Sequence, residues 1–179
     1  MNIIETKLTY LKTQPESMLS PCDTYLKQGN ALFNVGKYIE AIDSYNKCLT
    51  LNANINTLLA AEAYYRKSFS FLRLDKFYQS IKESDSCLAL DSMYVIAYVT
   101  KGFCFKILKR DDESTQMLNT AMNILDTMSF EETTANNEIY KEYLLNRGLT
   151  LRGLKEYEKA MESYDKLIMM GEGPQFENG

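Results

Sequence analysis

The stretch GNALFNVGKYIEAIDSYNKCLTLNA, residues 29–53, carries a pattern that the rest of the chain repeats. A second copy lies within YYRKSFSFLRLDKFYQSIKESDSCLALDS, residues 64–92, and further copies follow from Tyr98 and from Leu144. In register, the copies define units of equal length at 22–55, 61–94, 95–128 and 141–174. A fixed period of this size predicts an array of repeats stacked on one another rather than a single irregular core.

Each unit contains two apolar stripes with the i, i+4, i+7 spacing of a helix face. In the first unit these stripes are Tyr25-Gly29-Leu32 and Ala41-Tyr45-Cys48. Gly36 lies between them and can adopt the left-handed conformation that ends a helix. Since one helix pair cannot bury its stripe alone, we expect an all-α, right-handed solenoid of about four helix-turn-helix repeats. A simple antiparallel helical bundle is the structural alternative.

The pattern resembles the tetratricopeptide repeat, a unit of about 34 residues with W-x-x-L-G-x-x-Y, then A-x-x-x-F, then P. The resemblance covers residues 22–174 and is strongest in the first unit. No unit has the first-position Trp, and other residues replace the final Pro. The third unit is the weakest, because Lys109 and Asp111 stand where the turn glycine and the large ring are expected. Its second helix is therefore expected to begin or pack irregularly.

The two ends of the array carry different signals. Ser20, Pro21 and Asp23 form a helix start, in which Ser20 caps and Asp23 completes a capping box. Residues 1–20 before it are expected to form a short helix and linker, either an end cap or a partner-docking helix. The array takes residues 21–174, the insert 129–140 extends a helix or loops out, and residues 175–179 read as a disordered tail.

No capping helix follows the last unit, so an exposed apolar end is predicted at Leu167, Ile168, Met169 and Met170. This end is a candidate contact with another subunit or a second copy.

In the family that the pattern resembles, the first helix of each pair lines a concave surface that binds ligands. The resemblance implies a partner-binding groove lined by Lys27, Asn30, Phe33, Asn34, Tyr65, Arg66, Phe69, Arg73, Thr100, Phe103, Lys106, Asn146, Leu149 and Arg152. Asp23, Glu62 and Glu142 are the fewer facing acids. Arginine binds carboxylates with two hydrogen bonds, and aromatic rings are rigid anchors. These residues suit an extended peptide segment that bears a carboxylate or acidic side chains, or else form a solvated face.

Some family members bind the acidic C-termini of heat-shock chaperones through a two-carboxylate clamp. Asn30 matches the clamp's first Asn, but Leu26, Arg66, Ile96 and Thr100 occupy its other positions. One match in five does not favour this mode, although a chaperone stays a candidate partner.

Composition argues against several other classes of function. The chain has no histidine, so neither a Cys/His zinc site nor a Ser-His or Cys-His nucleophile pair can form, and no phosphate-binding glycine motif is present. We therefore expect neither an enzyme nor a metal or cofactor site. The net charge of −4 argues against a nucleic-acid partner, and no apolar run is long enough for a membrane span. Cys22, Cys48, Cys87 and Cys104 are expected to be reduced, buried thiols in a cytoplasmic protein.

Together these features predict a protein-interaction adaptor or scaffold that binds a segment of another protein in its groove. A structural subunit of a larger assembly and a co-chaperone are the alternatives.

Overall fold

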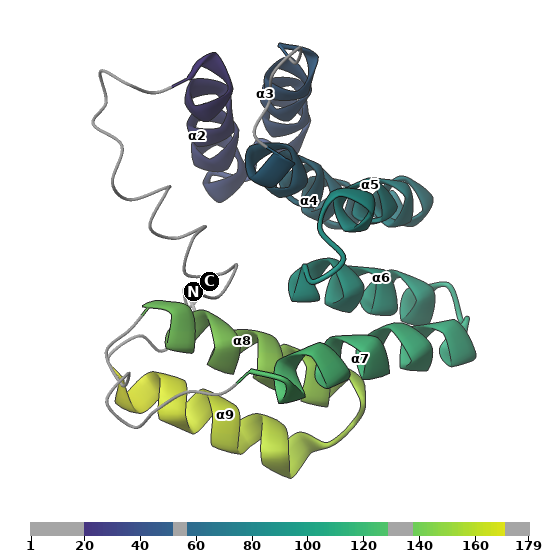
Figure 1. Cartoon of the computed structure of the whole chain (residues 1–179). Helices are drawn as coiled ribbons and strands as arrows, with labels where there is room; N and C mark the ends of the chain where they lie inside the picture. Colours follow the sequence, from purple (N-terminus) through teal and green to yellow (C-terminus); the bar gives the residue numbers. More distant parts are fainter. Residues whose placement is uncertain (1–19, 52–56, 129–137, 171–179) are drawn as a thin grey trace.

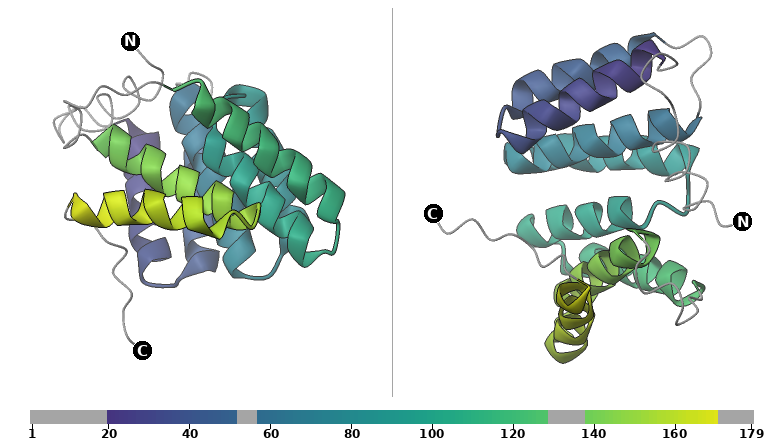
Figure 2. Two further views of the ribbon diagram at one scale, coloured as in Figure 1. Left: turned by 90° about the horizontal axis from the view of Figure 1, so that it is seen from below. Right: turned by 90° about the vertical axis from the view of Figure 1, so that its left-hand side faces the viewer.

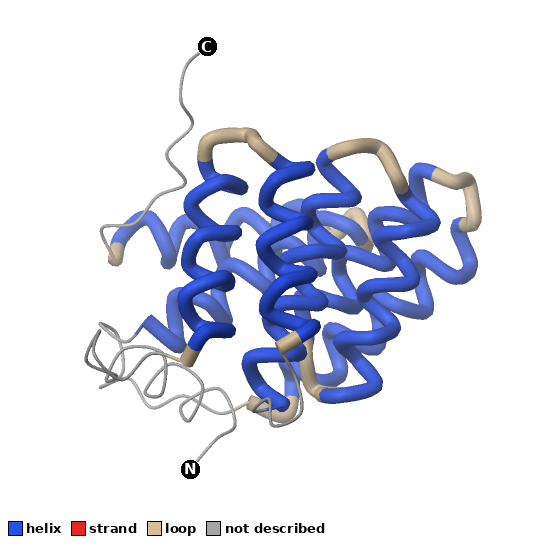
Figure 3. Tube along the Cα trace, turned by 90° about the horizontal axis from the view of Figure 1, so that it is seen from above, coloured by secondary structure: helices blue, strands red, loops and turns tan. Residues whose placement is uncertain are grey.

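The computed structural model describes residues 20–51, 57–128 and 138–170. This part of the chain folds into α-helices joined by short loops, without any strand among the described residues (Figure 3). None of the described helices combines the length and the apolar character needed to cross a bilayer. The predicted N-terminal helix within residues 1–20 and the predicted tail at 175–179 lie outside the described residues, apart from Ser20.

The helices form four successive antiparallel pairs that stack into a solenoid, as the sequence predicts (Figure 1). The pairs are α2 (Pro21–Asn34) with α3 (Tyr38–Thr50), α4 (Thr57–Arg73) with α5 (Phe77–Leu90), α6 (Val95–Ile107) with α7 (Asp111–Asp126), and α8 (Glu138–Gly153) with α9 (Tyr157–Met169). The helices α2, α4, α6 and α8 also contact one another in series. The last pair is turned relative to the first two, so the array twists along its length (Figure 2).

The start of α2 is a complete capping box. The Ser20 hydroxyl oxygen accepts a hydrogen bond from the Asp23 backbone N–H at 3.2 Å, and the Asp23 carboxylate accepts one from the Ser20 N–H at 2.9 Å. Pro21 stands at the first helical position, where a missing N–H costs nothing. The helix start predicted from the sequence is therefore confirmed.

A residue in the left-handed conformation ends the first helix of every pair. Gly36 has φ 79°, and its counterparts Asp75, Lys109 and Lys155 have φ values of 57°, 59° and 66°. This conformation costs a non-glycine residue about 1–2 kcal/mol. The packing of the helix pair must therefore offset that cost at three of the four turns.

The expected irregular start of the second helix in the third unit is wrong. The helix α7 begins at Asp111 and has three acidic side chains in its first turn, where they meet the positive end of the helix dipole. Arg110, immediately before it, pairs with Glu113. A good electrostatic start thus compensates for the missing ring and the missing turn glycine.

The two helices of the first pair approach closely because Gly29 has no side chain. A Cβ atom at Gly29 would lie 2.4 Å from the Tyr45 ring, and one at Gly148 would lie 2.4 Å from the Tyr164 ring in the fourth pair. In the third pair Leu118 takes the place of the ring, 2.9 Å from a Cβ at Gly102. A glycine on one helix is therefore matched by a large side chain on the other.

The second pair uses hydrogen bonds at the same place. Ser68 replaces the glycine and Ser84 replaces the ring, and their hydroxyl oxygens lie 2.7 Å apart. The Ser68 hydroxyl also donates to the backbone carbonyl of Ser80 at 2.9 Å. All three serines are buried, so these bonds satisfy groups that would otherwise destabilise the core.

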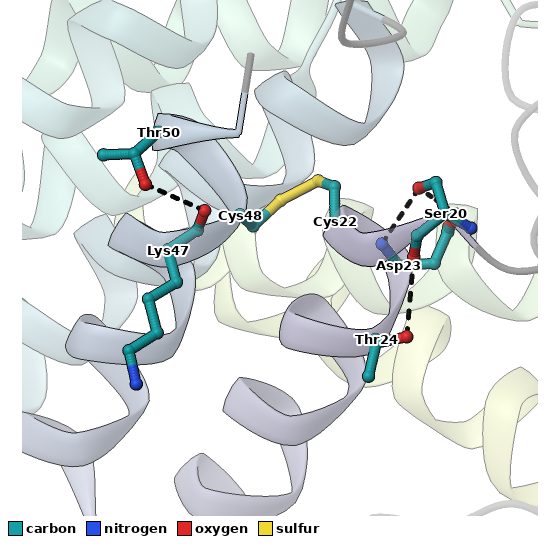
Figure 4. The surroundings of a disulfide bond; sticks show 7 residues. All are labelled: Ser20, Cys22, Asp23, Thr24, Lys47, Cys48 and Thr50. Carbon is teal, nitrogen blue, oxygen red and sulfur yellow. Dashed lines mark hydrogen bonds between the residues drawn. A yellow bond between two sulfur atoms is a disulfide. The ribbon is translucent and has the colours of Figure 1, made fainter.

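Two of the cysteines differ from the prediction. Cys22 and Cys48 are joined by a disulfide, so the expectation of a reduced thiol is wrong for this pair (Figure 4). Cys22 lies in the first turn of α2 and Cys48 in the last turns of α3, and antiparallel packing brings these turns together. In the second pair Ala61 stands at the position of Cys22 opposite Cys87, so no bond can form there. Cys87 and Cys104 are buried and form no disulfide, and burial raises the pKa of the Cys104 thiol.

The hydroxyl groups of Tyr45 and Tyr164 have different surroundings, so removing each should change the free energy of unfolding differently. The Tyr45 hydroxyl donates to the Asn30 side-chain oxygen at 2.9 Å, whereas the buried Tyr164 hydroxyl has no hydrogen-bond partner among the described residues. Tyr45→Phe should therefore lower the free energy of unfolding by about 1 kcal/mol, and Tyr164→Phe should leave it unchanged or raise it by up to about 1 kcal/mol. Urea denaturation of both variants measures the difference. Equal losses in both would contradict this account.

The disulfide predicts a dependence of stability on reductant. Closing a loop of this size stabilises a folded chain by about 3 kcal/mol in the chain-entropy model. Dithiothreitol should lower the free energy of unfolding of the wild type by that order, and it should have no effect on a Cys22→Ala/Cys48→Ala variant. Denaturation curves with and without reductant give both values, and a reductant effect that persists in the double variant would place its origin elsewhere.

Candidate functional site

The helices α4, α6 and α8 enclose a cavity of about 740 Å³, which we call the inter-repeat cavity. Its walls are mostly apolar, with Phe69 from α4, Val99 and Phe103 from α6, and Leu149 from α8. Cavities of this size that combine apolar walls with a few polar groups are the usual form of binding sites in proteins.

Five aromatic rings run from the first pair toward the cavity, and we call this series the aromatic ladder. Successive ring centroids lie 5.1 Å apart for Tyr38 and Phe33, 5.3 Å for Phe33 and Phe69, 6.1 Å for Phe69 and Tyr65, and 5.4 Å for Tyr65 and Tyr94. These separations are typical of favourable ring contacts. The ladder links three of the four pairs and ends in the cavity wall.

The charge of Arg66 is compensated inside the cavity. Its guanidinium donates to the Glu62 carboxylate at 2.6 Å, and the same carboxylate accepts a hydrogen bond from the Tyr94 hydroxyl. Burial by itself lowers the pKa of Arg66, but Glu62 and the neighbouring tyrosines outweigh this effect, so the net pKa lies above its usual range. Burial, followed by the Glu62 charge, raises the pKa of Tyr94. This end of the cavity therefore holds a closed polar cluster, not a free cation.

The other end of the cavity has two cations in its lining, Lys106 from α6 and Arg152 from α8. The Lys106 ammonium donates to the Gly153 carbonyl oxygen at 3.4 Å, and the Arg152 guanidinium lies 5.4 Å from the centre of the Phe103 ring. Within the described part of the chain, neither Lys106 nor Arg152 has a carboxylate at ion-pair distance. An anionic group could meet both side chains here without displacing an existing ion pair.

The structure brings together some of the predicted groove residues and separates the others. The cavity is lined by Tyr65, Arg66, Phe69, Thr100, Phe103, Lys106, Asn146, Leu149 and Arg152. The residues outside its lining are Lys27, Asn30, Phe33, Asn34 and Arg73. Phe33 still reaches the site through the aromatic ladder, and Arg73 lies over the Tyr38 ring at 5.3 Å.

Two polar residues predicted to contact a ligand make hydrogen bonds within the fold, and a third is buried. Asn30 accepts the hydrogen bond of Tyr45, and the Thr100 hydroxyl donates to the Ile96 carbonyl oxygen at 2.8 Å. Asn146 is buried in α8. A helical repeat pattern assigns a residue to a face, but it does not say how deeply that face is packed.

The positions of the chaperone-tail clamp offer little to a carboxylate. Leu26 is buried in the core of the first pair, and the Thr100 hydroxyl is already used by its own helix. Arg66 is held by Glu62. The geometry thus agrees with the single match in five positions that the sequence has.

Leu167 corrects the prediction for the C-terminal end. It is only 5% exposed and is part of the core, because it occupies the inward-facing position that Cys48 and Cys87 occupy in earlier pairs. Ile168 and Met169 are exposed, and Met170 is partly buried. The exposed apolar surface is therefore narrower than predicted.

Sequence reasoning missed much of the cavity wall. The lining also includes Met93 and Tyr94 just before α6, Val95, Ile96 and Val99 in α6, Leu125 in α7, Met128 just after it, and Tyr143 and Leu145 in α8. The run Val95–Val99, unusually apolar for a helix that faces a groove, was the available signal. The site is consequently more apolar than the predicted basic groove.

Comparisons with known proteins agree with the fold. The family model described as the tetratricopeptide repeat matches residues 23–55 and 141–170. A DnaJ homolog subfamily C member 7 homolog from Schizosaccharomyces pombe is 27% identical over 97 residues, covering 54% of this chain and 20% of the relative. A protein of the same name from Dictyostelium discoideum is 24% identical over 178 residues, covering 92% of this chain and 32% of the relative. The chain thus spans a third or less of the length of these relatives.

Solved structures give the same result. The second repeat domain of human RPAP3, solved in complex with the HSP70 peptide SGPTIEEVD, aligns with a TM-score of 0.57 at 18% identity. The alignment covers 77% of this chain and 95% of that domain. The chain therefore matches the tetratricopeptide repeat in its first and last units, and the described helix pairs between them stack in the same way.

Proposed function

We propose that the chain is a protein-interaction adaptor that binds an extended segment of a partner protein in the inter-repeat cavity. The observation that carries the proposal is the cavity itself, an apolar space between three helices with two cations at one end. Apolar side chains of the segment enter between Phe69, Val99 and Leu149. A carboxylate of the segment meets Lys106 and Arg152.

The cations at that end favour a segment with an acidic side chain or a C-terminal carboxylate next to its apolar residues. Arg152 can donate two hydrogen bonds to one carboxylate, and Lys106 adds a point charge. The aromatic ladder supplies rigid surface that loses little entropy on binding. The neutralised Arg66 contributes its ring contact with Tyr65, at 5.5 Å, rather than its charge.

A heat-shock chaperone tail is the second candidate ligand, since the RPAP3 domain named above was solved with such a peptide. In this chain its carboxylates would be held by Lys106 and Arg152 instead of by the clamp positions. A structural subunit of a larger assembly is the remaining alternative, and it requires contacts outside the cavity. The proposal that the protein is not an enzyme rests on the absence of histidine and of a phosphate-binding glycine motif from the sequence.

The test is a comparison of two charge-reversal variants. Lys106→Glu/Arg152→Glu removes both cavity cations, and Lys27→Glu/Lys109→Glu makes the same charge change at exposed sites outside the cavity lining. In affinity purification from the native cell, the partners of the wild type should be lost with the first variant and kept with the second. In titrations of the SGPTIEEVD peptide, the first variant should bind at least about tenfold more weakly if the tail is a ligand, because each charge-assisted hydrogen bond contributes about 1.5–3 kcal/mol.

The outcomes separate the candidates. Partners that survive in the cavity variant would contradict the adaptor proposal and favour the assembly subunit. Partners lost in that variant, together with no binding of SGPTIEEVD to the wild type, would leave the adaptor and exclude the chaperone tail. Circular dichroism of both variants checks that the helices are intact.

A further inference from the structure

The two ends of the inter-repeat cavity carry opposite charges. The acids in its lining are Glu62, Asp91 and Glu142. All three lie at the end that holds Arg66, so this end has more negative than positive charges. The opposite end is lined by the cations Lys106 and Arg152.

Contacts from three parts of the chain place the acids at one end. The Glu62 carboxylate of α4 accepts the hydrogen bond of Tyr94, which closes the turn that begins at Asp91. Burial raises the pKa of the Tyr65 hydroxyl, and the charges of Glu62 and Glu142 raise it further. The carboxylate of Glu142 on α8 therefore lies within electrostatic reach of α4. We call this part of the lining the acidic end.

The cations lie where α6 and α8 end. Lys106 reaches the Gly153 carbonyl oxygen at the end of α8, and Arg152 lies over the Phe103 ring of α6. Arg152 follows Glu142 by ten residues on the same helix, which corresponds to about 15 Å along its axis. The opposite charges of the cavity are thus separated by a stretch whose walls are mostly apolar.

A segment that fills this stretch also removes water from the acidic end. Removing water from carboxylates costs binding energy unless the ligand brings a positive charge of its own. A carboxylate has acceptor positions for more than one donor, so Glu142 can bind a ligand's cation in addition to its other contacts. A carboxylate on the ligand would complement only one of the two ends.

The dimensions of the cavity fit a chain in an extended conformation. A volume of about 740 Å³ over a length of about 15 Å gives a mean cross-section of about 50 Å². An extended chain with its side chains occupies about 5 Å by 10 Å, whereas a helix about 10–12 Å in diameter occupies about twice that area. At about 3.3 Å per residue, an extended segment crosses the stretch in about four or five residues.

We propose that the cavity selects an extended segment with two opposite charges, in which a lysine or arginine stands about four or five residues from a carboxylate and apolar residues lie between them. The basic side chain meets Asp91 and Glu142, and the carboxylate meets Lys106 and Arg152. This inference rests on the proposed function, and it specifies the class of segment that the cavity binds.

The test uses the acetylated and amidated peptide Ser-Lys-Leu-Phe-Leu-Glu-Ser, titrated into the full chain and followed by NMR of the methionine methyl groups. Saturable shifts are expected at Met93 and Met128, which line the cavity, and none at Met161, which lies outside its lining. Replacing the peptide's lysine by glutamine should weaken binding about threefold, as expected for a partly exposed ion pair. A helical peptide with the same two charges about ten residues apart should bind no better than the glutamine peptide.

A matched pair of variants assigns the effect of the lysine to the acidic end. Asp91→Asn/Glu142→Gln removes two charges and keeps an oxygen at position 91 that can accept the Met93 N–H. This variant should bind the lysine and glutamine peptides equally. Asp43→Asn/Glu162→Gln makes the same substitutions at exposed sites outside the lining, so it should keep the threefold difference.

The outcomes separate this inference from the proposed function. Equal binding of the lysine and glutamine peptides by the wild type, or tighter binding of the helical peptide, would overturn the inference. If Lys106→Glu/Arg152→Glu still abolished binding of both extended peptides, the proposed function would stand without it. No shift at Met93 and Met128 with any of the peptides would contradict the inference and would also count against the cavity as the binding site.

Discussion

The close approach of the two helices within each pair is the constraint on which the rest of the array depends. Gly29 against Tyr45 and Gly148 against Tyr164 leave no room for a side chain on the first helix. The ring fills the space between the helices and fixes their separation. A methyl group at either glycine would push the pair apart, and every later pair would then stack on a displaced surface.

The second pair meets the same constraint with different chemistry. Ser68 and Ser84 are smaller together than a glycine and a tyrosine, and hydrogen bonds hold the helices where a ring would otherwise pack. Ser80 extends this polar contact to the next pair, because the Cys104 thiol of α6 donates to its hydroxyl at 3.3 Å. Small side chains on both sides let α6 lie close to α5. The positions of α4 and α6, which supply apolar walls of the cavity, therefore depend in part on buried serines behind them.

The repeat spacing was sufficient to predict the helix pairs, their turns and the first capping box, because these features depend on residues close together in the sequence. The chemistry of the cavity depended on longer contacts. Glu62 and Arg66 stand four residues apart, so their ion pair was visible as a helical i, i+4 pair. The hydrogen bond from Tyr94 to Glu62 joins the residue before α6 to α4, 32 residues apart, and the sequence contains no local sign of it. For this reason the sequence predicted Arg66 as a basic group of the groove, whereas in the structure Arg66 is paired with Glu62.

The disulfide likewise depends on how two helices pack. Cys22 lies at the start of α2 and Cys48 near the end of α3. Because the two helices are antiparallel, the repeat register already placed these two residues side by side. The prediction of reduced thiols rested on compartment and spacing, which say nothing about that register. Cys87 occupies the equivalent place in the second pair and forms no disulfide because Ala61 faces it. One substitution between repeats thus separates a bridged pair from a buried thiol.

The cavity also depends on the packing of the fourth helix pair. The helix α8 supplies one wall of the cavity, including Leu149 and Arg152, and it is held in place on its far side by α9. In a stacked array each pair is stabilised by the pairs beside it. The packing of α8 against α7 and α9 therefore fixes this wall of the cavity.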